Sequence, residues 1–90
     1  MTEPFPVGEP RETRVKRMRM RSMRRGIKEM DIILMRFADA ELDGLSAAEL
    51  DAYDAVLSQN DQDLYQWVSG QQEAPANLAP MLARIAAVSG

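Results

Sequence analysis

The sequence of 90 residues contains no cysteine and no histidine. It therefore offers no disulfide bond, no thiol nucleophile, none of the usual zinc ligands and no side chain that shuttles protons readily at neutral pH. No apolar run reaches the about 18 residues needed to span a membrane, and no secretory signal peptide is visible. These absences argue against a secreted protein, membrane insertion and most enzyme chemistry, and they make the cytoplasm the expected location.

Basic residues are missing from a long part of the chain. Residues 39–73 hold nine acidic residues and no basic one, whereas residues 11–28 hold nine of the eleven basic residues and a single acid, Glu12. The net charge of −3 hides this asymmetry. If the two segments lie apart, the protein has two oppositely charged faces, and if they pack together, the protein is partly self-neutralised.

Proline and glycine concentrate at the start of the sequence. Residues 1–10 hold three prolines and one glycine, which predicts a flexible N-terminal arm. The arm carries acids and no basic residue, unlike a mitochondrial presequence. Residues 11–90 suffice for a single small domain. They show helical periodicity and no strand pattern, so we predict an all-α fold, a compact antiparallel bundle of about five short helices.

Local signals place the ends of these helices. The expected segments, caps included, are residues 11–25, 27–40, 46–57, 60–70 and 77–88. Residues 27–40 have the widest apolar face and should form the most buried helix. Ser46 and Glu49 form a capping box, and Asn60 and Asn77 can cap the last two helices. The only tryptophan, Trp67, is expected to anchor the core rather than to stack on a ligand.

The first helix carries a basic stripe. Plotted at about 100° per residue, five arginines fall within one arc: Arg14, Arg17, Arg21, Arg24 and Arg25. Val15, Met20 and Met23 fall on the other side and should face inward. The stripe is compatible with a solvated surface, a nucleic-acid or anionic-lipid surface, or a protein-docking face. The acidic net charge and the lack of aromatic residues among the arginines argue against nucleic acid.

The octet Arg24-Arg25-Gly26-Ile27-Lys28-Glu29-Met30-Asp31 joins the basic segment to the apolar helix. Glycine within a helix costs about 1 kcal/mol relative to alanine, so Gly26 marks a junction or a close approach. Were the helix continuous, Arg25 and Glu29 would share a face, because they are four residues apart. The sequence leaves open whether the helix breaks at Gly26. It also leaves open whether this is a docking point for another chain or a helix end with a surface ion pair.

Two passages resemble one known family. The pattern Arg24-Arg25-Gly26-x-x-Glu29-x-Asp31 is similar to the RRGxxExD signature of the succinate dehydrogenase FAD assembly factors, the SdhE or flavinator family. Residues 60–70, NDQDLYQWVSG, resemble that family's second block, an acidic turn that leads into an aromatic helix ending in glycine. One departure is Gln62, where the family often has proline. The resemblance covers roughly residues 12–88.

The resemblance implies an assembly factor that acts as a chaperone and not as an enzyme. Members promote covalent attachment of FAD to the flavoprotein subunit of succinate dehydrogenase, and of fumarate reductase in some bacteria. The bond joins a flavin methyl group to a histidine of that partner, so the FAD belongs to the partner and this chain is expected to hold no cofactor stably. The implied partner-binding residues are Arg25, Gly26 and Glu29, with Arg24 and Asp31 beside them. No catalytic residue and no metal ligand is expected.

A docking hypothesis follows from these residues. Gly26 would let the partner's backbone approach, while Arg25 and Glu29 would fix its orientation through charge-assisted hydrogen bonds. Docking would bias a mobile flavoprotein domain toward a closed state in which FAD and its histidine are aligned. The chain is expected to be a monomer with no nucleic-acid partner. The rival hypothesis is a small helical protein-interaction or antitoxin-like regulatory module that uses the basic face of the first helix.

Overall fold

The computed structural model describes residues 10–89 of the chain. Its elements in chain order are α1 (Arg11–Arg21), α2 (Lys28–Glu41), the short 3-10 helix η1 (Leu42–Gly44), α3 (Ala47–Leu57), α4 (Asp61–Val68) and α5 (Ala79–Ser89). Residues 10–89 contain no strand, so the all-α prediction is confirmed. The arm expected at residues 1–10 lies, up to residue 9, outside the described part, and the single domain expected for residues 11–90 stays a prediction.

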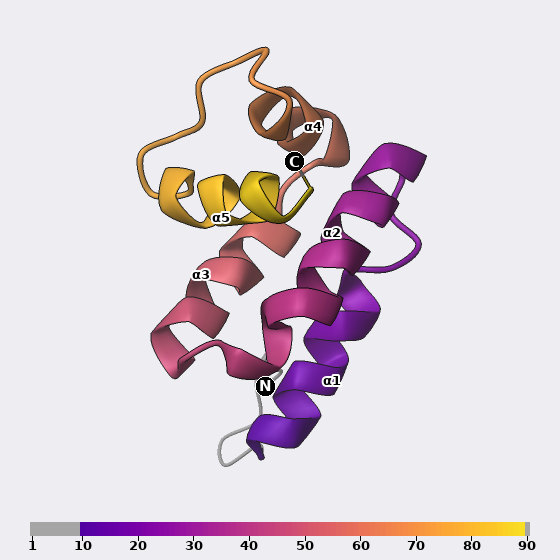
Figure 1. Cartoon of the computed structure of the whole chain (residues 1–90), viewed down its shortest axis with the longest axis vertical. Coiled ribbons are helices and arrows are strands. Elements are labelled where there is room, and N and C mark those ends of the chain that lie inside the picture. The colour runs from indigo at the N-terminus through magenta and orange to yellow at the C-terminus, as the bar shows by residue number, and fades with distance from the viewer. Residues whose placement is uncertain (1–9, 90) are drawn as a thin grey trace, which may run out of the picture.

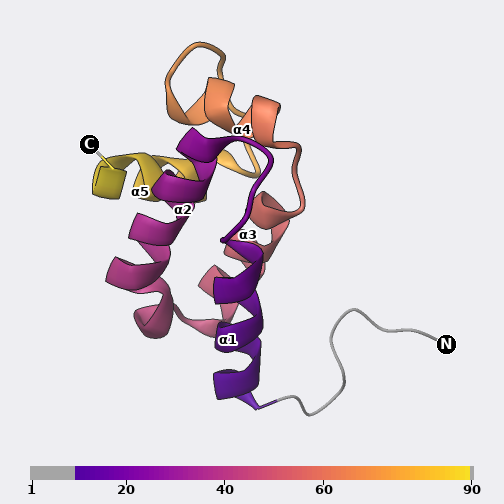
Figure 2. The same ribbon diagram turned by 90° about the vertical axis from the view of Figure 1, so that its right-hand side faces the viewer.

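The helices form a compact bundle in which α1 and α2 run in opposite directions (Figure 1). In both views α4 and α5 lie at one end of the molecule and the start of α1 lies at the other (Figures 1 and 2). The connection from α1 to α2 climbs toward the α4 end before α2 descends (Figure 2). This loop therefore brings the octet, residues 24–31, next to α4, which begins thirty residues after the octet ends.

One apolar core draws on all five α-helices, with α2 and α3 contributing most. Phe37 of α2 and Tyr53 of α3 are both fully buried, and their ring centroids lie 5.1 Å apart. A polar contact is buried beside them, because the Tyr53 hydroxyl lies 2.6 Å from Oγ of Ser22. Ser22 Oγ donates to the Met18 carbonyl at 2.9 Å, so the tyrosine hydroxyl is the donor to Ser22. The end of α1 is thus tied to the middle of α3.

The first helix is shorter than predicted. It ends at Arg21 rather than at residue 25, so it breaks well before Gly26. The buried Ser22 hydroxyl donates to the Met18 carbonyl in the last turn of α1. Two residues later, Arg24 has the left-handed conformation, with φ of 55°. A residue with positive φ interrupts a right-handed helix, which needs φ of about −60° at every position. The helix α2 then starts at Lys28 after an extended Ile27.

The inner face of α1 was also wrong in part. Val15 is buried as expected, but Met20 is 67% exposed and Met23 is 39% exposed. Met18, which is fully buried, takes the inner position instead. Val15, Met18 and Ser22 are spaced three and four residues apart, so they share the buried side of the chain here. Met20 and Met23 lie away from that side.

Most predicted helix caps are present. Ser46 and Glu49 form the capping box with hydrogen bonds of 3.1 Å and 2.7 Å, and the Asn60 side chain accepts from the Gln62 amide. The Asn77 cap was wrong, because α5 begins at Ala79 and a turn closed by the Pro75 carbonyl precedes it. Trp67 is partly buried against the core.

The basic and acidic segments pack together, so the protein is partly self-neutralised. Arg14 bonds Asp51 at 2.5 Å, and Arg21 bonds Asp54. Arg19 bonds Asp39 at 2.8 Å. The arginines of α1 therefore serve largely to attach α1 to its neighbours.

Candidate partner-binding site

The five predicted site residues meet at the junction of α1 and α2. Arg24, Arg25 and Gly26 lie on the loop between the helices, while Glu29 and Asp31 lie at the start of α2. Because the helix is broken, they do not share one helix face. The structure divides them into residues that face solvent and residues that are bonded to the rest of the bundle.

Arg25 is the inward-facing residue of the group, with 13% of its side chain exposed. Its Nε and Nη2 both lie 2.8 Å from Oδ1 of Asp61. Nη1 donates to the carbonyls of Arg21 and Leu57, at 3.0 Å and 3.2 Å, and Nη2 donates to that of Gln59 at 3.3 Å. The planar guanidinium thus joins the end of α1, the end of α3 and the start of α4, a task that suits arginine and not lysine.

Gly26 is bonded to the same carboxylate. Its backbone N–H donates to Oδ2 of Asp61, so the two oxygens of one side chain accept from two consecutive residues. A Cβ added at Gly26 would lie 3.2 Å from Oδ2 of Asp61, which is tighter than an ordinary contact. The absence of a side chain at Gly26 therefore has a reason within the chain itself.

Asp61 is the residue that the sequence reasoning missed. The sequence places it in the first turn of α4, where it suits the helix dipole, and gives it no other role. In the structure it is as shielded as Arg25, with 13% of its side chain exposed. The one feature of the sequence that pointed to Asp61 was its place within residues 60–70, the second passage that resembles the family. No local pattern pairs residues 36 positions apart.

Of the remaining predicted residues, Arg24 and Glu29 face solvent and Asp31 is only partly exposed. Arg24 and Glu29 are both exposed, and Glu29 lies in the first turn of α2. Arg25 and Glu29 do not share a face, because Arg25 turns toward Asp61. Asp31 is partly buried, and its Oδ1 is shielded from solvent without a hydrogen-bond partner among the described residues.

A shallow hollow of about 310 Å³ adjoins this junction, lined by Gly26, Ile27, Asn60, Asp61 and Gln62. Its walls come from the loop and the first turn of α4, the two passages that resemble the family. Two of the lining residues, Asn60 and Gln62, have amide side chains, a type that can hydrogen-bond to another chain.

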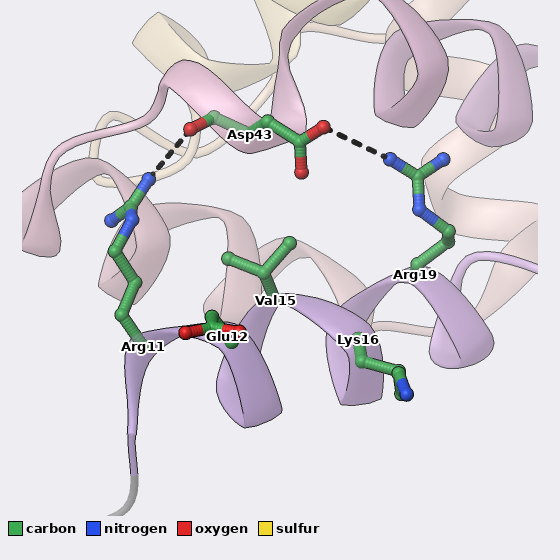
Figure 3. A pocket seen from close by; sticks show the side chains of 6 residues that line it. All are labelled: Arg11, Glu12, Val15, Lys16, Arg19 and Asp43. Atoms are coloured by element: carbon green, nitrogen blue, oxygen red, sulfur yellow. Dashed lines mark hydrogen bonds and ion pairs between the residues drawn. The ribbon is translucent and has the colours of Figure 1, made fainter.

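A second hollow of about 460 Å³ lies between α1 and η1, lined by Arg11, Glu12, Val15, Lys16, Arg19 and Asp43 (Figure 3). Asp43 bridges it, since its carbonyl accepts from Arg11 at 2.8 Å and its carboxylate lies 3.8 Å from Arg19 (Figure 3). It contains none of the predicted site residues. Among residues 10–89 no cluster of three or more acidic side chains is placed to hold a metal ion, and no helix is long and apolar enough to cross a bilayer.

Comparisons with known proteins identify related sequences. A family model described as flavinator of succinate dehydrogenase matches residues 16–89. The chain is 47% identical over 63 residues to the mitochondrial succinate dehydrogenase assembly factor 2 of Meyerozyma guilliermondii, covering 70% of this chain and 47% of that protein. It is 37% identical over 62 residues to the FAD assembly factor SdhE of Legionella pneumophila (strain Lens), covering 69% of this chain and 78% of that protein. The chain spans about half the length of the fungal relative.

Proposed function

The chain belongs to the family of flavinators of succinate dehydrogenase, and from this premise we propose that it binds the flavoprotein subunit of succinate dehydrogenase and promotes covalent attachment of FAD to it. The observation that carries the proposal is the family match over residues 16–89, which includes both the α1–α2 junction and the first turn of α4. The name of the bacterial relative, an FAD assembly factor, supports the same role. The flavoprotein of fumarate reductase is a further client of the same kind.

The proposed action is that of a chaperone and not of an enzyme. The sequence has neither cysteine nor histidine, so it supplies no strong nucleophile and no neutral-pH base. FAD is the substrate of the partner's reaction, and this chain holds none stably. Its own contribution is to bind and orient: docking stabilises a flavoprotein conformation in which the reacting groups are aligned, which lowers the barrier without contact to the reacting atoms.

The site residues divide into two roles in this proposal. Arg24 and Glu29 are exposed and contact the partner through charge-assisted hydrogen bonds. Gly26 presents bare backbone at the edge of the hollow. Arg25 acts through the shape of the loop, because its guanidinium is bonded inside the bundle. Asp31 lies beside them and is the fifth candidate.

The rival module that docks through the basic face of α1 receives less support. Arg14, Arg19 and Arg21 are bonded to aspartates of neighbouring elements, so this face is partly neutralised within the chain. The monomeric state and the cytoplasmic location stay predictions. The relatives include a protein named as mitochondrial as well as a bacterial one.

Flavinylation in cells tests the proposal. The protein is co-expressed with its host's succinate dehydrogenase flavoprotein subunit in cells that lack their own assembly factor. Flavin fluorescence is then measured on the denatured subunit in a gel. We expect fluorescence that requires this protein and is lost with Gly26→Arg or Glu29→Ala, while each variant keeps wild-type helicity. Glu73→Ala, a change at an exposed loop residue, is the matched control and should retain activity. Equal fluorescence with and without the protein would refute the assembly role.

A further inference from the structure

We infer that Asp61 is a positioning residue for partner binding, and that the lack of a side chain at Gly26 leaves room for the Asp61 carboxylate. This inference rests on the proposed function and deepens it. It assigns to α4 the task of holding the Arg25–Gly26 segment in the shape that the flavoprotein recognises. Direct contact with the partner is then left to the exposed neighbours of that segment.

The first argument is the pattern of bonds at the carboxylate. Oδ1 of Asp61 accepts from Arg25, and Oδ2 accepts from the Gly26 amide. Both side chains of the ion pair are 13% exposed, so water competes weakly for these bonds. A single side chain of α4 thereby fixes both the direction of the arginine and the plane of the following peptide group. We call this set of bonds among Arg25, Gly26 and Asp61 the Asp61 brace.

The second argument is that few hydrogen bonds restrain the backbone of the loop, although the Arg25 side chain also bonds the carbonyls of Arg21, Leu57 and Gln59. Arg24 adopts a left-handed conformation, which is disfavoured for a residue with a Cβ and persists where the surroundings hold it. Among the described residues, the Gly26 amide is the only one of the four backbone amides from 24 to 27 that makes a hydrogen bond. Within residues 10–89, Asp61 is therefore the one group that restrains the backbone of residues 24–27 through an amide hydrogen bond.

The third argument concerns the added Cβ at Gly26, which would meet Oδ2 of Asp61 at 3.2 Å. The carboxylate cannot easily retreat, because its other oxygen is held by Arg25. A single methyl group at Gly26 should thus weaken the Asp61 brace even though it adds little obstruction toward a partner. This separates the inference from the simpler view that glycine is needed only to let the partner's backbone approach.

The test compares Asp61→Asn with Asp63→Asn, a change at an exposed residue in the same first turn of α4. Affinity for the purified flavoprotein subunit is measured by calorimetry, and exchange of the Gly26 amide by NMR, below the melting temperature of each variant. Losing a charge-assisted bond corresponds to about a tenfold effect or more. We expect Asp61→Asn to weaken binding and to speed Gly26 exchange by at least about that factor, and Asp63→Asn to change neither. Arg25→Lys, which keeps the charge but loses the guanidinium contacts, provides the same comparison if Asp61→Asn does not fold.

A double variant isolates the role of the glycine. Gly26→Ala should weaken binding in the wild-type background and have little further effect in Asp61→Ala, where the oxygen that the methyl group meets is gone. Additive losses of affinity in the double variant would overturn the inference. So would an Asp61→Asn protein whose Gly26 amide exchanges fast but which binds the flavoprotein with wild-type affinity. If the wild-type chain fails to bind the flavoprotein, the proposed function falls and the positioning role falls with it, while the exchange data still report whether the Asp61 brace exists.

Discussion

Replacing Tyr53 by phenylalanine should destabilise the protein by the value of one buried hydrogen bond. The ring is fully buried, and its hydroxyl donates to Ser22 Oγ at 2.6 Å. Removing the hydroxyl leaves Ser22 with its bond to the Met18 carbonyl, so no polar group loses every partner. The expected loss in free energy of unfolding is about 1 kcal/mol. For a domain of this size that corresponds to a fall of about 4–8 °C in melting temperature.

Replacing Ser22, the residue that accepts this hydrogen bond, should lower the free energy of unfolding more than replacing Tyr53. Ser22→Ala removes both bonds of the serine and leaves the Tyr53 hydroxyl buried without an acceptor, which costs about 1–3 kcal/mol. The double variant, Tyr53→Phe with Ser22→Ala, leaves neither hydroxyl buried without a partner. Its loss in free energy of unfolding should therefore be clearly smaller than the sum of the two single losses. Urea unfolding followed by circular dichroism gives all the values. Additive losses would refute the hydrogen bond as the source of the effect.

The same tyrosine should give the protein a dependence on alkaline pH. Burial raises the pKa of Tyr53, and its hydrogen bond to Ser22 is a smaller opposing influence on that pKa. The folded state therefore keeps the phenolic proton at a pH where the unfolded chain releases it, near pH 10. The unfolded state then binds fewer protons, and stability falls as the pH rises through about 10 and beyond. Tyr53→Phe should show a shallower decline, and parallel curves for the two proteins would contradict this.

Three further outcomes follow from packing, capping and charge. Met18→Ala should lower the free energy of unfolding by about 2–5 kcal/mol, because this side chain is fully buried, while Met20→Ala should change it little; equal losses in urea unfolding would show that the inner face of α1 is wrongly placed. Ser46→Ala should cost about 1 kcal/mol through loss of the capping box, and Ser69→Ala, at the end of α4, should cost clearly less in the same assay. The chain should bind neither duplex nor single-stranded nucleic acid in fluorescence anisotropy at low salt, because most arginines of α1 have partners within the chain; affinity that falls steeply with salt would contradict this.

Local sequence signals predicted the parts of the fold that depend on neighbours in the chain. The capping box at Ser46, the Asn60 cap and the buried face of α2 involve residues at most eight positions apart, so composition and spacing sufficed. The end of α1 could not be predicted in this way. It is fixed by the contact of Ser22 with Tyr53, which lie 31 residues apart, and arginine and methionine at the following positions favour a longer helix.

The candidate site shows the same limit. The octet could be recognised from its pattern, but the sequence left open whether the helix breaks at Gly26, and the structure places the break before it, after Arg21. Which of its charged residues face solvent could not be predicted, because Arg25 is turned inward by Asp61, 36 residues later. Two arginines that are adjacent in sequence thus have opposite surroundings, one exposed and one 13% exposed.

The distance along the chain between Gly26 and Asp61 has a consequence for biosynthesis. A ribosome adds Asp61 35 residues after Gly26, which at cellular elongation rates takes about 2–7 s. Once Asp31 has been added, the nascent chain carries the whole octet but lacks the carboxylate of Asp61 for the rest of that interval. A fragment that ends before α4 would lack the Asp61 carboxylate permanently. We therefore expect the flavoprotein to discriminate finished chains from nascent or truncated ones, so that recognition itself acts as a check that synthesis and folding are complete.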